Sequence, residues 1–214
     1  MHVPDGFFAP QTWIPAAGVA TAGWAWALRR LRRALSARVV PVLGVTTACC
    51  FGLMLIAVPL PLGGASVHAT GVAVLALHFG VPIAFLAISL VLALQALLLG
   101  DGGVTSLPVT ALALGLAGPV VAVVAARLAR PLGPAAARFA AGWFAVMAAA
   151  LVTALLLGLQ PHLAHDAAGE PLFFPFGWST VLPAVLLPHA AVGVLEGVLT
   201  VVALRGLDRE ATPA

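Results

Sequence analysis

The chain has 214 residues, of which 62% are hydrophobic and only 8% are charged, whereas a water-soluble domain carries roughly 25% charged residues. This small number of charges cannot cover a water-facing surface. The composition therefore excludes an ordinary soluble domain and predicts one compact domain in a lipid bilayer. The net charge is +3, and all ten basic residues are arginines near the ends of apolar runs. This pattern is typical of membrane topology signals and excludes nucleic acid as a partner.

Hydropathy and Gly/Pro-rich turns predict about seven transmembrane helices in an all-α membrane protein with one domain, residues 1–214. In chain order, the expected spans are 10–28, 39–58, 67–79, 82–99, 104–126, 139–158 and 180–204. The third span is short, so we expect it to be buried among its neighbours.

The count of seven depends on a break at Phe-Gly-Val-Pro, residues 79–82, within a long apolar stretch. With this break, the arginine clusters at 29–38, 127–138 and 205–209 all fall on one side of the membrane. Cytoplasmic loops are enriched in Lys and Arg. We therefore expect the N-terminus outside, folded into the molecule, and the C-terminus in the cytoplasm.

The first two residues, Met1 and His2, give the strongest chemical signal. His2 is too large for efficient removal of an initiator methionine, so we expect the Met1 amine to remain. That amine, the His2 amide nitrogen and His2 Nδ1 can close a five-membered and a six-membered chelate ring on one metal ion. A fourth nitrogen would complete the square plane that suits Ni(II) or Cu(II). The alternative is an exposed, unstructured terminus.

The candidate for the fourth nitrogen is His68, which we expect to begin a helix on the same side of the membrane. Its alternative interpretation is a hydrogen-bonded histidine at a helix start. Binding displaces the amide proton of His2, so metal affinity is expected to fall as the pH drops.

Four stretches resemble the cobalt/nickel substrate-capture subunits of energy-coupling factor ABC transporters, the CbiM/NikM type. Residues 1–7, MHVPDGF, are similar to the Met-His-Ile-Pro-Asp-Gly-Phe opening of that family; the others are GASVHATG (64–71), LQALLLGDGG (94–103) and the segment from His189 to Thr200. The resemblance implies a seven-helix subunit in the bacterial inner membrane that holds the metal with the Met1 amine, the His2 amide and imidazole nitrogens, and His68.

The resemblance also implies partners: a membrane coupling (T) subunit, a pair of cytoplasmic ATPases and often a small accessory membrane subunit. After Gly103 the family usually continues with a polar segment that contains asparagine. Residues 106–115 contain no asparagine, which leaves open whether the substrate is Co²⁺ or Ni²⁺.

Other polar residues have two interpretations each. Ser66 and Asp101 are candidates for support of a metal-bound histidine, although Asp101 also suits a turn in which it bonds its own backbone. His189 and Glu196 lie two helical turns apart, so they share one face of a helix. We interpret them either as a structural clamp to a neighbouring helix or as part of a transport step.

The remaining candidates are weaker. His162 and His165, in the polar segment 159–178, either collect metal at the outer face or are simply solvated. His78, Cys49 and Cys50 are interpreted as structural residues.

The sequence thus predicts a membrane component that captures Co²⁺ or Ni²⁺ from outside for ATP-driven uptake. It has no Gly-rich phosphate loop, so we expect this chain to bind no ATP. An intramembrane enzyme is disfavoured because the His-Glu-x-x-His and Gly-x-Ser-x-Gly motifs are missing. A self-sufficient permease is the other alternative, and it would require polar stripes along several helices.

Overall fold

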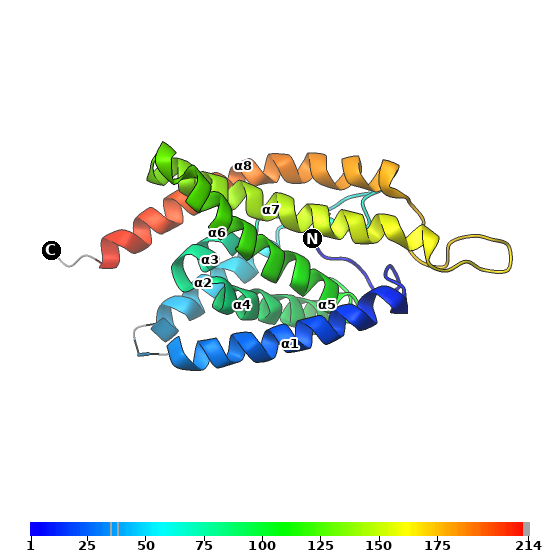
Figure 1. Ribbon diagram of the computed structural model, residues 1–214, viewed down its shortest axis with the longest axis horizontal. Coiled ribbons are helices and arrows are strands. Elements are labelled where there is room, and N and C mark those ends of the chain that lie inside the picture. Colours follow the sequence, from blue (N-terminus) through cyan, green and yellow to red (C-terminus); the bar gives the residue numbers. More distant parts are fainter. Residues whose placement is uncertain (35, 38, 212–214) are drawn as a thin grey trace.

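The computed structural model describes residues 1–34, 36–37 and 39–211. These residues form seven consecutive helical rods and one short β-hairpin (Figure 1), which confirms the predicted all-α fold class. The rods are α1 (Pro10–Ala34); α2 (Val39–Met54); α3 (Val72–Phe79); α4 (Val81–Leu94) with η1 (Gln95–Leu99); α5 (Leu107–Thr110) with η2 (Ala111–Ala117), α6 (Gly118–Ala129) and η3 (Arg130–Leu132); α7 (Pro134–Leu159) with η4 (Gln160–His162); and α8 (Trp178–Ala211).

Four rods of the described chain are long and apolar enough to cross a membrane: Val81–Leu99, Leu107–Leu132, Pro134–His162 and Trp178–Asp208. Helix α2 is apolar but shorter, with 16 residues. Helix α3 has only eight residues, about 12 Å at 1.5 Å per residue, so it cannot span a hydrocarbon core of about 30 Å by itself. Its residues Val72–Ala76 are buried, because α3 packs inside the bundle against α4, α6, α7 and α8.

The second and third rods differ from the ranges that hydropathy predicts. Helix α2 ends at Met54, and α3 begins at Val72, because the residues between them form an antiparallel hairpin. Its strands are β1 (Val58–Pro59) and β2 (Ser66–Val67). The expectation that His68 begins a helix is therefore wrong: His68 follows β2 and precedes α3 by four residues. The break expected at 79–82 is a single residue, Gly80, between α3 and α4.

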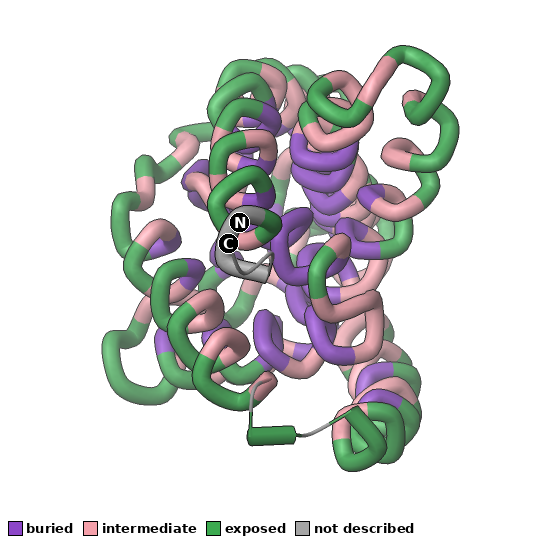
Figure 2. Tube along the Cα trace, turned by 90° about the vertical axis from the view of Figure 1, so that its left-hand side faces the viewer, coloured by how far each residue is buried: buried purple, intermediate pink, exposed green. Residues whose placement is uncertain are grey.

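Helices α7 and α8 lie side by side along one edge of the molecule (Figure 1) and pack extensively on each other. Gly142 of α7 lies so close to α8 that an added Cβ would overlap the main chain of Glu196, and such small residues let membrane helices approach closely. The purple segments of Figure 2 show that buried residues face the interior of the bundle, whereas the outer sides of the helices are exposed.

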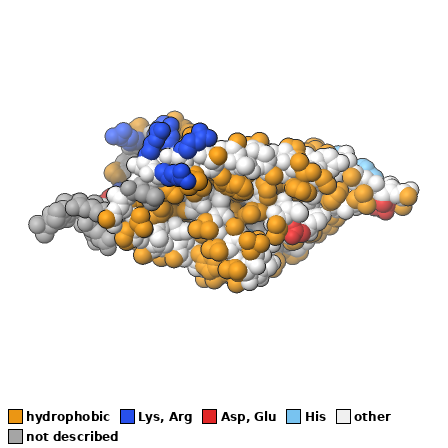
Figure 3. All heavy atoms as spheres, turned by 90° about the horizontal axis from the view of Figure 1, so that it is seen from below, with side chains coloured by type: hydrophobic (Ala, Val, Ile, Leu, Met, Phe, Trp, Pro, Cys, Tyr) orange, Lys and Arg blue, Asp and Glu red, His pale blue; other side chains and the backbone are white. Residues whose placement is uncertain are grey.

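Arginine side chains gather at one end of the face shown in Figure 3, where α1 ends with Arg32 and Arg33 in its last turn. At the cytoplasmic end expected from the sequence, Arg138 at the start of α7 forms an ion pair with Asp208 near the end of α8. Arg38 and the side chain of Arg209 lie outside the described residues. The orientation of the two ends across the membrane stays a prediction.

Candidate metal centre

The first nine residues contain a turn at residues 5–8 and precede α1, and Met1, at the start of this segment, is only 1% exposed. Main-chain hydrogen bonds hold the segment to two loops. Gly103 donates its N–H to the carbonyl of Val3 (2.9 Å), and Ser66 donates its N–H to the carbonyl of His2 (3.2 Å). The N-terminus is therefore folded into the molecule between the β-hairpin and the loop that precedes α5.

The other end of this segment is fixed to α7 and to the loop before α8. The amide of Ala9 donates to Oε1 of Gln160 (2.8 Å), a side chain that is fully buried. Phe174 donates its N–H to the carbonyl of Phe7 (3.3 Å), and the two rings lie 5.4 Å apart. Contacts at both ends thus determine how deeply Met1 enters the bundle.

Asp5 ties the middle of the segment to the loop after Gly103. Its carboxylate accepts hydrogen bonds from the N–H groups of Val104 (3.1 Å) and Thr105 (2.7 Å) and from the Thr105 hydroxyl. The Thr105 hydroxyl is the main cause that lowers the pKa of Asp5, followed by these backbone N–H groups. The buried Ser106 hydroxyl donates to the carbonyl of Val3. Hydroxyl groups of Thr105 and Ser106 thus hold the N-terminal segment at this loop.

Two glycines allow this loop to approach the N-terminus. Gly102 has a φ of 88° and lies against the His2 ring, so that an added Cβ would be 3.4 Å from His2 Cδ2. At Gly103 an added Cβ would overlap the main-chain nitrogen of Asp5. The Gly-Asp-Gly-Gly turn is thus the surface on which the terminus rests.

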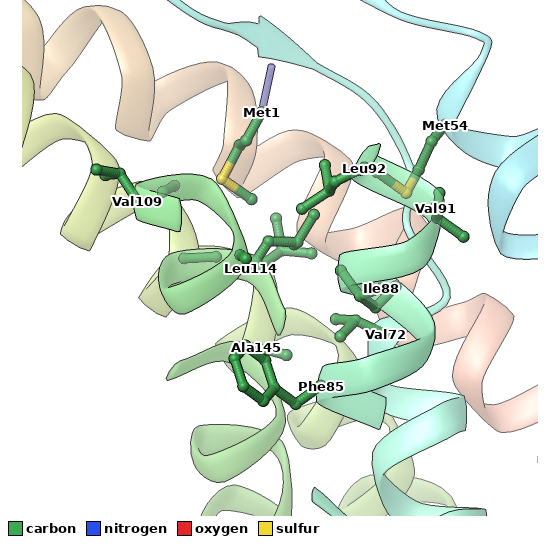
Figure 4. Packing of buried hydrophobic residues seen from close by; sticks show 14 of the residues in the cluster. Met1, Met54, Val72, Phe85, Ile88, Val91, Leu92, Val109, Leu114 and Ala145 are labelled. Carbon is green, nitrogen blue, oxygen red and sulfur yellow. The ribbon is translucent and has the colours of Figure 1, made fainter. Parts of the chain in front are cut away.

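The nitrogen atoms predicted to bind metal are brought together. The Met1 amine contacts Nε2 of His68, and the rings of His2 and His68 are stacked with centroids 4.7 Å apart. The Met1 side chain points away from these nitrogens into the apolar core, where Figure 4 shows its sulfur among residues that include Leu92 and Leu114. Burial of this side chain anchors the amine beside the two histidines.

Each of the two imidazoles is held in a tautomer that leaves one nitrogen free to bind a cation. His2 Nε2 lies 2.9 Å from the carbonyl oxygen Oε1 of Gln95, to which it donates, so His2 Nδ1 keeps its lone pair. His68 Nδ1 lies 3.1 Å from the carbonyl of Ala69, which leaves the lone pair on Nε2, the atom that meets the Met1 amine. These partners also fix the ring orientations, as is usual for metal-binding histidines.

Burial keeps the donor nitrogens free of protons. It lowers the pKa of the Met1 amine to about 4, although the nearby Asp101 carboxylate raises it. Burial and then the Met1 amine lower the pKa of His2, also to about 4. The pKa of His68 is well below its usual value because of burial first, then the Met1 amine and His2, with a smaller contribution from His189. At neutral pH all three groups therefore present lone pairs.

Oxygen atoms surround these nitrogens. The Ser66 hydroxyl accepts the amide N–H of His2 (3.1 Å), and Asp101 Oδ2 lies 3.3 Å from His2 Nδ1. Since His2 is unprotonated at neutral pH, this contact is not an ion pair but a lone pair facing a carboxylate. A divalent cation beside both groups would relieve that repulsion.

The part of the chain that the structure describes holds no group of three or more His, Cys, Asp or Glu side chains able to bind a metal ion. The predicted centre is different in kind, because two of its expected nitrogens, the Met1 amine and the His2 amide, belong to the main chain. A cavity of about 930 Å³ leads to it, lined by His2, Ser66 and Asp101 among others, whereas Met1 and His68 lie behind this lining.

The other predicted residues fall into two groups. Glu196 is fully buried on α8, and its carboxylate accepts the N–H groups of Thr70 and Gly71, just after His68. His189 is also buried, and its Nδ1 lies 2.7 Å from the carbonyl of Val185. Glu196 therefore adjoins the segment that carries His68, whereas the hydrogen bond of His189 stays within its own helix.

The remaining histidines and the cysteines lie elsewhere. None of them lines the cavity. The rings of His162 and His78 contact Trp178 and Phe79, respectively; His165 is exposed and forms a bridge with Pro171; Cys49 and Cys50 are free thiols.

Gln95 is a site residue that the sequence analysis did not single out. It is fully buried on the rod formed by α4 and η1. A signal was available: Gln95 is an amide within an apolar run, and a buried amide needs a hydrogen-bond partner.

The fold and the buried terminus define a multi-pass membrane protein of the transition-metal transporter type. A crystal structure of a truncated transition metal transporter superposes with a TM-score of 0.93 at 33% identity, covering 98% of this chain and 99% of the other. The match of residues 2–212 to the model of CbiM, the cobalt uptake substrate-specific transmembrane region, shows that the chain belongs to this family.

Curated relatives agree. The fused nickel transport protein NikMN of Rhodobacter capsulatus is 33% identical over 98% of this chain, and a putative metal transport protein of Haloquadratum walsbyi is 31% identical over 94%. The chain spans 62% of the Rhodobacter capsulatus protein and 65% of the probable fused nickel transport protein LarMN of Lactiplantibacillus plantarum.

Proposed function

We propose that the protein is the substrate-specific membrane component of an energy-coupling factor transporter, which captures Ni²⁺ or Co²⁺ at the outer face of the cell membrane. The ion is bound by four nitrogens: the Met1 amine, the His2 amide nitrogen, His2 Nδ1 and His68 Nε2. Ser66 and Asp101 support them, with Ser66 at the amide and the Asp101 carboxylate adding negative charge.

One observation carries this proposal: the amine of Met1 is buried in contact with His68 Nε2. A polar chain end is costly to bury unless it gains a partner that repays its loss of hydration. A metal ion supplies that partner, because it binds the lone pairs of both the amine and the imidazole.

The donor set favours Ni²⁺. Four nitrogens in one plane, two of them from adjacent residues of the main chain, match the geometry that Ni(II) accepts readily. Binding releases the amide proton of His2, so affinity decreases as the pH is lowered.

The energy for uptake comes from partners: a membrane coupling subunit, a cytoplasmic ATPase pair and a small accessory membrane subunit. Relatives named as fused proteins, NikMN and CbiMQ of Methanocorpusculum labreanum, support a role shared with further units. This chain then contributes recognition of the metal and no ATP hydrolysis.

The decisive experiment moves the amine. Three glycines added before Met1 convert its amine into a peptide N–H and place the new terminus three residues away from His2, so Ni²⁺ binding measured by calorimetry is expected to be lost. A C-terminal glycine extension is the matched control and should bind as the unmodified chain does. Equal affinity in both extended proteins would disprove the four-nitrogen centre.

A second measurement separates this function from that of a self-sufficient permease. Proteoliposomes that contain the chain alone are expected to bind Ni²⁺ without accumulating it, whereas addition of the coupling subunit and the ATPases with ATP starts uptake. Full-rate uptake by the chain alone would contradict the proposed role.

A further inference from the structure

Among the buried side chains that the structure describes, three polar atoms have no hydrogen-bond partner: Gln95 Nε2, Thr153 Oγ1 and His189 Nε2. Neither of the first two atoms suits a transition-metal ion. Gln95 Nε2 is an amide donor without a lone pair to offer, and a neutral hydroxyl such as that of Thr153 is a hard oxygen ligand. His189 is different, because its ring is rigid and its two nitrogens have fixed directions.

The tautomer of His189 follows from its one hydrogen bond. Nδ1 lies 2.7 Å from the Val185 carbonyl, so Nδ1 carries the hydrogen and Nε2 carries the lone pair. The side chain is 0% exposed. A fixed, solvent-free lone pair in the interior is costly unless a cation or a donor meets it.

The face of α8 that carries His189 looks toward the metal centre. On this face Val185 packs against Gly63, and Glu196 binds the N–H groups of Thr70 and Gly71. His189 lies between these two contacts along α8, so it faces the middle of the 63–71 segment, where His68 lies.

Helix α8 also packs against β2, the strand that immediately precedes His68. The cavity that opens to the outer face is lined by His2 but by neither His68 nor His189. An ion that enters from this cavity therefore reaches His2 first, then His68 and the Met1 amine, and His189 last.

We propose that His189 Nε2 is a second metal donor, which takes the ion over from the Met1–His2–His68 centre as the ion leaves toward the cytoplasm. This inference rests on the proposed function. In the transfer, a bond from the metal to His189 Nε2 forms while the bonds to the two His2 nitrogens break. The His2 amide nitrogen takes a proton from a water molecule, which leaves as hydroxide through the cavity beside His2, and the oxidation state of the metal does not change.

This order of exchange keeps the ion bound throughout. The Met1 amine and His68 Nε2 remain bound while His2 is exchanged for His189, so the ion is never released into an apolar interior, where a bare charge is very costly. Neutral imidazole is a good donor for both Ni²⁺ and Co²⁺, so the relay serves either substrate.

The experiment compares His189→Ala with a matched histidine variant, His78→Ala, which lies on α3 beside Phe79. Ni²⁺ binding is measured by calorimetry on the purified chain, and ⁶³Ni uptake is measured with the complete transporter in cells. We expect His189→Ala to bind Ni²⁺ nearly as the native chain does while uptake falls about tenfold or more, the scale at which a lost metal-site partner acts. His78→Ala should change neither quantity.

Two further variants test directly whether His189 binds the metal. In His2→Ala the first centre loses the imidazole nitrogen and with it the six-membered chelate ring, and weak residual Ni²⁺ binding is expected; the double variant His2→Ala/His189→Ala should lose this residual binding. The inference is overturned if His189→Ala retains native uptake, if it loses binding together with uptake, or if the double variant binds as His2→Ala does. Failure of the native chain to bind Ni²⁺ would instead refute the proposed function itself.

Discussion

Three histidine side chains, His2, His68 and His189, share one arrangement. In each, one ring nitrogen donates to a neutral oxygen, from Gln95, the Ala69 carbonyl or the Val185 carbonyl. A neutral acceptor fixes the tautomer without adding charge, so the second nitrogen keeps its lone pair. In the proposed metal centre, these hydrogen bonds orient the donors from one step beyond the metal.

Gln95 tests this arrangement. In Gln95→Leu the His2 ring loses the acceptor of its Nε2 hydrogen, so the other tautomer becomes available and the ring loses its orientation. Ni²⁺ affinity, measured by calorimetry, is expected to fall by about 10-fold to 100-fold. Gln11→Leu, at an exposed position of α1, is the control and should bind normally. Native affinity in Gln95→Leu would show that another contact orients His2.

At the residue scale, the chemistry of the terminus was predictable because chelate rings are fixed by covalent bonds. The pairing of Met1 with His68 was expected from their placement on one side of the membrane and from the family resemblance, because a separation of 67 positions leaves no local signature in the sequence. Gln95 was detectable only as a polar residue in an apolar run, and nothing in the sequence names its partner.

Among the elements, the N-terminal segment depends on the turn before α5. In Gly103→Ala the new Cβ would overlap the main chain of Asp5, so the segment must shift and the amine must leave its place. We expect Gly103→Ala to weaken Ni²⁺ binding by at least an order of magnitude, consistent with the precision that metal sites require. Gly18→Ala, in α1 with nothing within 4 Å of the new Cβ, should leave binding unchanged.

Glu196 of helix α8 holds the segment that carries His68 in place through hydrogen bonds. In Glu196→Ala the buried N–H groups of Thr70 and Gly71 lose their acceptor, at about 1–3 kcal/mol for each unpaired group. Thermal unfolding in detergent should shift to lower temperature, and Ni²⁺ affinity should decrease as His68 loosens.

The conservative variant Glu196→Gln distinguishes the loss of the hydrogen bonds from the loss of the carboxylate charge. Glu196→Gln keeps one carbonyl oxygen as acceptor and should retain most of the stability and affinity that Glu196→Ala loses. Glu170→Ala, in the exposed loop before α8, is the control. If Glu196→Ala unfolds and binds like the native chain, the contact with Thr70 and Gly71 does not position His68.

Hydropathy predicts the order and number of the rods but not the hairpin between α2 and α3. Residues 55–71 are nearly as apolar as a helix, so composition cannot distinguish them from a membrane span. What distinguishes them is the main-chain pairing of Val58 with Val67, together with the turn between the strands. Long-range pairing of this kind has no local signature in such an apolar sequence.

At the scale of the whole molecule, the orientation in the membrane is open to direct measurement. With Cys49 and Cys50 replaced by alanine, a single cysteine is placed at Ala167, in the loop before α8, or at Ser36, after α1; both positions are exposed. The arginine distribution predicts that a membrane-impermeant maleimide labels Ala167→Cys in intact cells and Ser36→Cys only after lysis. The reverse result would invert the topology and put the metal centre at the cytoplasmic face.

The docking of residues 1–9 also has a consequence for biogenesis. The Met1 amine meets His68, and Ala9 meets Gln160, a separation of 151 residues. The N-terminal segment leaves the ribosome first. It can reach its final position only after Gln160, which follows α7, has been synthesised. Contacts of such long range form slowly, so the centre becomes complete among the last steps of assembly, after most of the helices have entered the membrane.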